Sequence, residues 1–396
     1  MSAMPSISRD RKMRAALLDE ATTRSLLQEY AASVALTDRL PPDKVQPVLM
    51  GLFGEVGSLM ATSKKRLRDE DAYSEYSDAV CEEFGDVLWY LGAICRRMKI
   101  KLEALFLDAG NKDNATRLAV ANCTAETRLE ASVPIISAKL EHVLIELGQA
   151  ASGLLAINAD NEAARRLLLE FVNRYLRAID AVGVRFGDVV LFNSHKARDR
   201  FIKPNFAEMP VFDSGFDPEE QLPWEFEIEV TQRKSGQSYL RMNGVFVGDP
   251  LTDNIADSDG YRFHDVFHFA YAAILHWSPT FRALLKQKRK SNKVVDESQD
   301  GGRAIVVEEG LAAYIFSRAK RLEFFASHDR VSYDLLKTVQ RFVQGYEVDA
   351  CPASLWEIAI LEGYKVFRQV RDNEGGVVIG NRHDRMIEYR KIGGRG

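Results

Sequence analysis

Three carboxylates in two apolar stretches are the first residues of this sequence that could do chemistry. Glu55 lies in "MGLFGEVGSLMA" (50–61), and Glu83 and Asp86 lie in "CEEFGDVLWYL" (81–91). Glu83 and Asp86 are three residues apart, so a helix places both on one face. Ionised carboxylates are costly in apolar surroundings unless a positive charge accompanies them. Because oxygen-only ligation suits Mg²⁺ or Mn²⁺, this pattern predicts such a metal site, although carboxylates on the solvated face of an amphipathic helix give the same spacing.

A second cluster of polar residues combines histidines with acids. His264, Asp265 and His268 lie in "RFHDVFHFAYA" (262–272), and the two histidines are four apart and share a helix face. Glu308 and Glu309 begin another apolar helix about forty residues later. One hypothesis is a second metal or phosphate site in which His264, Asp265 and His268 converge with Glu308 or Glu309, with Asp265 and Glu309 in catalytic roles. The other is a set of satisfied polar groups that brace a helix pair, with His268 donating to a buried glutamate.

Two basic residues near this cluster are candidate substrate contacts. Arg262 directly precedes the histidine helix, and Lys288 lies in the run "KQKRKSNK" (286–293). A positive side chain beside a phosphate site would hold the substrate. The basic run is also what a solvated surface segment looks like.

Composition limits the classes of protein to consider. The 396 residues predict two or three domains, and the net charge of −4 gives no reason to expect binding to nucleic acid or to a membrane surface. The four scattered cysteines argue against a disulfide framework and favour a reducing compartment. The N-terminus lacks the apolar segment of a secretory signal, and no apolar run approaches the length of a membrane span. We therefore expect a cytoplasmic protein with no membrane partner.

The elements that must position these residues are mainly helical. Apolar periodicity predicts helices near 10–38, 45–62, 74–98, 101–117, 127–157, 160–182 and 187–200, and again between about 261 and 371. A loop or linker rich in Pro, Gly and Asp covers 203–223. A strand follows at 224–232, then a hairpin around Asn243-Gly244, and the tail holds a further candidate strand pair.

The helical part also repeats itself weakly. Residues 82–117 can be laid on 168–201, since both contain an acidic residue followed by Phe, a Tyr-Leu pair, Ala-Ile, and a closing cluster of Asn, Lys and Arg. The second copy lacks the aspartate, and Asn173 and Arg174 stand near its position. Shared amphipathic periodicity accounts for part of this likeness.

Residues 24–117 resemble a MazG-like domain of the all-α nucleoside triphosphate pyrophosphohydrolase superfamily, in the "GLFGEVG" entry, the "EEFGDVLWYL" helix and the closing Asn/Lys/Arg cluster. The resemblance implies a helical bundle that cleaves nucleoside triphosphates between the α and β phosphates with Mg²⁺. It implies metal-ligand and catalytic roles for Glu55, Glu83 and Asp86. It also implies phosphate contacts by Lys112 and Arg117, whose spacing is one residue longer than expected.

The resemblance is incomplete at one metal position. Ser58 stands where the family pattern has the second glutamate of its ExxE motif, so Glu82 or Asp78 substitutes for it or the site is weakened or inactive. The stretch 255–320 echoes the first domain with a permuted helix order and a site modified by histidine. An HD-type phosphohydrolase fits less well, because the outlying His and Asp of that family are not found.

The sequence thus predicts a mainly α protein: a MazG-like domain (1–120), a degenerate helical repeat (121–205) and a C-terminal α+β domain with the His/Asp/Glu cluster (206–396). The expected function is Mg²⁺-dependent cleavage of a (d)NTP to (d)NMP and pyrophosphate, in nucleotide-pool cleaning, stress or antiviral nucleotide depletion. The alternative is a catalytically degenerate scaffold that senses a nucleotide or binds a partner. A homo-oligomer stays open.

Overall fold

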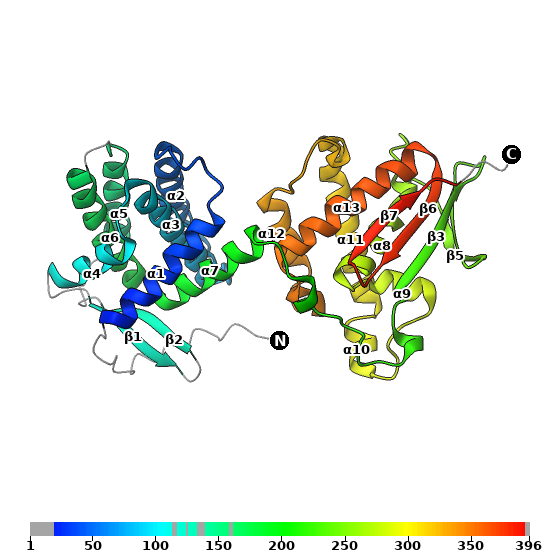
Figure 1. The fold of residues 1–396 in the computed structure, drawn as a ribbon, viewed down its shortest axis with the longest axis horizontal. Coiled ribbons are helices and arrows are strands. Elements are labelled where there is room, and N and C mark those ends of the chain that lie inside the picture. Colours follow the sequence, from blue (N-terminus) through cyan, green and yellow to red (C-terminus); the bar gives the residue numbers. More distant parts are fainter. Residues whose placement is uncertain (1–19, 113–116, 124–125, 133–138, 158–160, 393–396) are drawn as a thin grey trace. The chain divides into compact units, whose positions relative to one another are not determined.

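The computed structural model describes the chain except residues 1–19, 113–116, 124–125, 133–138, 158–160 and 393–396 (Figure 1). The chain divides into two compact units, Ser2–Ile202 and Lys203–Gly396. The described part is mainly helical with a small antiparallel sheet, so the predicted fold class is confirmed. None of its helices is both long and apolar enough to cross a bilayer.

The first unit is a helical bundle with one apolar core. Its helices are α1 (Glu20–Thr37), α2 (Gln46–Asp69), α3 (Tyr76–Met98), α4 (Leu102–Lys112), α5 (Leu140–Leu154), α6 (Asn161–Val182) and α7 (Phe186–Phe201). The core runs continuously from Leu27 in α1 to Val189 in α7, and it includes Phe84 and Leu88 of α3 and Tyr175 of α6. Because α3 packs against both α2 and α7, side chains far apart in the sequence meet on its surface.

A two-stranded hairpin interrupts the helices of this unit. Strands β1 (Arg117–Cys123) and β2 (Glu126–Ser132) pair antiparallel, with Arg117 opposite Ser132. The predicted helix over 127–157 is therefore wrong at its start, and α5 begins only at Leu140. Glu, Arg, Leu and Ala are good helix formers, but "ETRLEAS" alternates polar and apolar residues as a strand does.

The second unit combines a five-stranded antiparallel sheet with helices. The strands are β3 (Glu225–Gln232), β4 (Ser238–Met242), β5 (Val245–Leu251), β6 (Gly375–Asn381) and β7 (Met386–Arg390), in the order β5-β4-β3-β6-β7. The predicted strand, hairpin and C-terminal strand pair are thus confirmed. Asn243 and Gly244 both have positive φ, 51° and 81°, as a tight hairpin turn of this composition requires.

Helices cover this sheet and carry the histidine cluster. They are α8 (Asp265–Ala270), α9 (Pro279–Leu285), α10 (Lys293–Ser298), α11 (Gly302–Ala319), α12 (Tyr333–Phe342) and α13 (Ala353–Asp372). The long helix α13 packs on β6, β7 and α8, as Figure 1 shows for the sheet. A π-helical turn, Tyr271–Leu275, follows α8 directly. Such turns often lie beside functional sites.

The loop at 203–223 is anchored in the second unit. Asp213 is fully buried and accepts from Arg282 and Arg382, in each case at 2.6 Å. The two guanidinium groups hold the pKa of Asp213 below its usual value, although burial alone would raise it. Removing one partner of such a pair is costly, so the loop is a structural part of this unit.

Candidate functional sites

The carboxylates of α2 and α3 meet as the sequence predicts. Glu55 of α2 shares a hydrogen bond with Glu83 of α3 and lies within electrostatic reach of Asp86. Burial, together with the charges of Asp86 and Glu83 and against the opposing effect of Lys196, raises the pKa of Glu55 to about 7. A half-buried glutamate beside two other carboxylates favours a proton or a cation at this place.

Helix α7 supplies a cation to this group that the sequence analysis missed. The Lys196 ammonium donates to Glu82 Oε1 at 2.9 Å and to Asp86 Oδ2 at 2.6 Å. Asn193, one turn earlier, donates to Asp86 Oδ1 at 3.3 Å and accepts from the buried Tyr30 hydroxyl at 2.7 Å. The signal in the sequence was the Asn/Lys/Arg cluster that closes the second repeat copy.

Close packing of α3 and α7 makes these contacts possible. A Cβ atom on Gly85 would lie 2.8 Å from Asn193 Cβ, which is closer than real Cβ contacts come. Glycine at 85 therefore lets α7 approach α3 closely enough for Asn193 and Lys196 to reach the neighbouring Asp86.

Glu82, one of the two acids expected to compensate for Ser58, lies beside Asp86 and Lys196. Ser58 is exposed on α2, and Asp78 is exposed near the start of α3. Glu82 is half-buried and shares Lys196 with Asp86, so it is the acid that joins the group. Four carboxylates (Glu55, Glu82, Glu83 and Asp86) thus gather beside the Lys196 ammonium.

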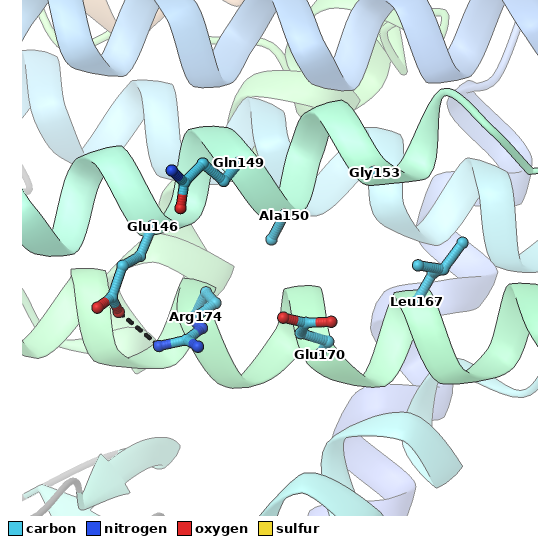
Figure 2. A pocket seen from close by; sticks show the side chains of 7 residues that line it. All are labelled: Glu146, Gln149, Ala150, Gly153, Leu167, Glu170 and Arg174. Carbon is cyan, nitrogen blue, oxygen red and sulfur yellow. Dashed lines mark hydrogen bonds and ion pairs between the residues drawn. The ribbon is translucent and has the colours of Figure 1, made fainter.

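The second helix pair of this unit, α5 and α6, carries a different arrangement. "ELG" (146–148) in α5 repeats the "EVG" (55–57) of α2, and Glu170-Phe171 in α6 repeats Glu83-Phe84. Figure 2 shows the pocket between these helices, where the Arg174 side chain pairs with Glu146 beside Gln149 and Glu170. Arginine thus neutralises a carboxylate of this pair internally, and the predicted degenerate repeat stays a prediction.

The side chains of two predicted phosphate contacts lie outside the described part of the structure. Lys112 ends α4 and Arg117 begins β1, and neither side chain belongs to the described residues. Their roles stay predictions.

In the second unit, α8 and α11 bring His264, His268 and Glu309 together. One ligand atom from each of the three lies within 4.8 Å of the others. His264 Nε2 is 3.4 Å from Glu309 Oε2, and His268 Nε2 is 3.3 Å from Glu309 Oε1. Both histidines are buried, whereas 38% of the Glu309 side chain is exposed. These three groups form a site that solvent reaches from one side.

Glu308 and Asp265 take different places around this site. Glu308 is fully buried, and its Oε1 lies 2.9 Å from His268 Nδ1 and accepts from the Ser278 hydroxyl at 2.7 Å. Asp265 Oδ1 lies 3.8 Å from His264 Nε2. Burial raises the pKa of Asp265 against the opposing charges of the two histidines. Glu308 therefore contacts the Nδ1 atom of His268, on the side of the ring away from Glu309, and Asp265 lies at the edge of the site.

Electrostatics couple the histidines to Glu309. Burial disfavours a charged His268, but Glu308 and Glu309 together hold its pKa well above the usual value. Burial also acts against ionisation of Glu309, yet hydrogen bonds from His264 and His268 hold its pKa below the usual value. The arrangement thus favours a positive charge between the imidazoles and Glu309.

The two predicted basic contacts lie in separate surroundings. The Arg262 guanidinium donates to both oxygens of Asp253, at 2.8 and 2.6 Å, and to Gly236 O at 2.8 Å. These bonds tie the loop before α8 to the β3–β4 turn, so Arg262 has a structural task there. Lys288 is half-buried in the loop between α9 and α10. Their predicted roles as substrate contacts stay untested.

Comparison with known proteins relates the second unit to one family. Residues 207–393 match the family model of the MazG C-terminal domain. The gene 37 protein of Mycobacterium phage L5 is 37% identical over 60 residues, which is 15% of this chain and 53% of that protein. This chain therefore matches only about half the length of that curated relative. No solved structure matches the chain. The chain is thus similar to MazG through its second unit, which supports a MazG-like relationship.

Proposed function

We propose that the chain is a metal-dependent nucleoside triphosphate pyrophosphohydrolase, with its active site on α2, α3 and α7. The observation that carries this proposal is the meeting of Glu55 with Glu83 and Asp86, where burial and the two neighbouring charges raise the pKa of Glu55 to about 7. The similarity of the second unit to the MazG C-terminal domain supports it independently.

The group of carboxylates fits a hard divalent cation. Four carboxylates gather here beside the Lys196 ammonium, and their side chains are partly buried. Glu55, Glu83 and Asp86 would hold Mg²⁺ or Mn²⁺ through oxygen atoms alone. When bound there, the metal would activate water and neutralise charge on the triphosphate.

The chain's own residues would then bind and orient the substrate. Lys196 presents its ammonium between Glu82 and Asp86, where it can donate to a phosphate oxygen of a bound triphosphate. Asn193, fixed by the Tyr30 hydroxyl, holds Asp86 in a single orientation. We assign to the α2–α3 carboxylates the task of holding this metal, so that water attacks a phosphorus of the triphosphate, the bond between the α and β phosphates breaks, and a nucleoside monophosphate and pyrophosphate leave.

A specific observation also favours a second candidate function. Ser58 removes one carboxylate, and Lys196 already pairs with Asp86. A site of this kind could bind a nucleotide as a sensor or a scaffold without cleaving it. Binding in calorimetry with no product is the result that this candidate requires.

Chromatography of nucleotide mixtures tests the proposed activity. The full chain is incubated with ordinary and modified NTPs and dNTPs, with Mg²⁺ and with a chelator. Monophosphate and pyrophosphate in equal amounts, formed only with Mg²⁺, are the expected products. The preferred nucleotide then separates pool cleaning, which needs a modified substrate, from stress or antiviral depletion, which needs ordinary ones. Diphosphate with free phosphate, or no product with any nucleotide, would contradict the proposal.

A further inference from the structure

The two imidazoles of the second unit are held in the same tautomer. His264 Nδ1 lies 2.9 Å from the Tyr261 carbonyl oxygen, which can only accept, so Nδ1 carries a proton. His268 Nδ1 lies 2.9 Å from Glu308 Oε1. The Glu308 carboxylate receives the Ser278 hydroxyl on Oε1 and the Thr280 N–H on Oε2, so it too acts as an acceptor toward His268. Both Nε2 atoms are therefore left as the outward-facing ligands.

Both Nε2 atoms face one carboxylate. They stand 3.4 and 3.3 Å from the two oxygens of Glu309, and the His268 side chain is fully buried. Two lone pairs facing a carboxylate repel one another unless a positive charge lies between them. Ligand atoms bonded to a tetrahedral metal at about 2.1 Å stand about 3.4 Å apart, which matches these separations.

The outer partners have the arrangement that metal-binding histidines need. A metal-bound imidazole usually donates its other N–H to a carboxylate or a backbone carbonyl, which fixes the ring. Glu308 does this for His268, and the Tyr261 carbonyl does it for His264. His264 immediately precedes α8 with helical backbone angles and His268 follows four residues later, so both rings lie on one side of the helix, toward Glu309 of α11.

We propose that His264, His268 and Glu309 bind one divalent transition-metal ion of the zinc class, in a site separate from the Mg²⁺ site proposed for the first unit. Two imidazole nitrogens with one carboxylate suit Zn²⁺ or Co²⁺ far better than Mg²⁺, which prefers oxygen. Three protein ligands, with Glu309 partly open to solvent, leave a fourth position for water or for Asp265 at the edge. The site is therefore of the open type that can act on a bound molecule.

Metal binding to the full chain tests this inference without any measurement of turnover. Chelator-treated protein is dialysed against Zn²⁺ or Co²⁺ with excess Mg²⁺, and bound metal is measured by mass spectrometry. We expect one equivalent of zinc-class metal per chain, and a visible Co²⁺ spectrum of four-coordinate form. His264→Ala and Glu309→Gln should each weaken binding at least 10-fold. Glu308→Gln should weaken it about 10- to 100-fold, as losses of outer partners usually do.

The control removes a histidine from elsewhere. His142 is exposed on α5 in the first unit, and His142→Ala should bind metal as the unaltered protein does. Glu309 is partly exposed whereas His264 is buried, and circular dichroism shows whether their variants fold. Binding that is absent in the unaltered chain, or unchanged in both folded variants, would overturn the inference. The remaining explanation would then be a protonated His268 that braces α8 against α11. Because the readout is bound metal, this outcome is independent of any result on nucleotide cleavage.

Discussion

Replacing Lys196 by methionine tests the charge balance of the proposed active site. The substitution keeps the length of the side chain but removes the ammonium that bonds Glu82 at 2.9 Å and Asp86 at 2.6 Å. The three side chains are only 17%, 12% and 23% exposed, so water screens the change poorly. The cluster then holds four carboxylates with no ammonium from α7 beside them.

The expected loss of stability lies between two limits. Exposed ion pairs contribute about 0.2–1 kcal/mol, whereas removing one partner of a fully buried pair costs about 3–5 kcal/mol. Because Lys196 and Asp86 have intermediate exposure, we expect the substitution to lower the unfolding free energy by about 2 kcal/mol. For a unit of this size, that loss lowers the melting temperature by roughly 4–8 °C. In a double-mutant cycle with Asp86→Asn, we expect a coupling energy of about 1–2 kcal/mol. Either substitution alone already removes the Lys196–Asp86 ion pair, so the second substitution costs less in the double mutant than it does alone.

Scanning calorimetry of the full chain measures these values. Lys64→Met, on the exposed face of α2, is the matched control, and its melting temperature should stay within about 1 °C of that of the unaltered protein. Added Mg²⁺ should recover more stability in Lys196→Met than in the unaltered protein, because the metal then supplies the missing positive charge. The reasoning is refuted by a transition in Lys196→Met equal to that of the control, together with zero coupling to Asp86.

Two further predictions concern packing and pH. Gly85→Ala should destabilise the first unit by about 1–3 kcal/mol and reduce nucleotide binding, because the new methyl group meets Asn193 at 2.8 Å. Gly153→Ala, a helical glycine with room for a methyl group, should be close to neutral in the same denaturation and binding assays. Burial and the charge of Arg385 lower the pKa of His276 to about 3 from its usual 6.5, so protonation favours unfolding. The second unit should therefore lose up to about 1.4 kcal/mol per pH unit as pH falls from 6.5 toward 3. Asparagine suits the positive φ of 59° at this position. Urea unfolding at several pH values should therefore show that the unfolding free energy of His276→Asn falls less steeply with decreasing pH than that of the unaltered chain.

The sequence predicts the acidic half of the first site well. Helical spacing places Glu83 and Asp86 on one face, and the polar connection after α2 allows Glu55 to return beside them. It does not predict Lys196, because that residue lies 110 positions from Asp86 and reaches it only through the packing of α7 on α3. Periodicity describes one helix at a time, whereas this contact depends on how three helices assemble.

In the fold as well, features set by neighbouring residues could be predicted, whereas features that depend on distant contacts could not. The hairpin at Asn243-Gly244 follows from turn chemistry, and the structure has it. The hairpin of β1 and β2 was missed, because residues with high helix propensity form β2 and only their alternation indicates a strand. At the histidine site, the i,i+4 spacing placed the two rings together. The tautomers could not be predicted, because they depend on the Tyr261 carbonyl and on Glu308.

The most direct test of the central claim compares Asp86→Asn with Asp265→Asn in the nucleotide cleavage assay. Asp86 lies in the carboxylate group of α2 and α3, and Asp265 lies at the edge of the histidine site. Both substitutions are nearly isosteric, and each removes one negative charge. The account predicts that Asp86→Asn abolishes formation of monophosphate and pyrophosphate, while Asp265→Asn leaves it measurable. Full activity in Asp86→Asn, or its loss only in Asp265→Asn, would contradict the account.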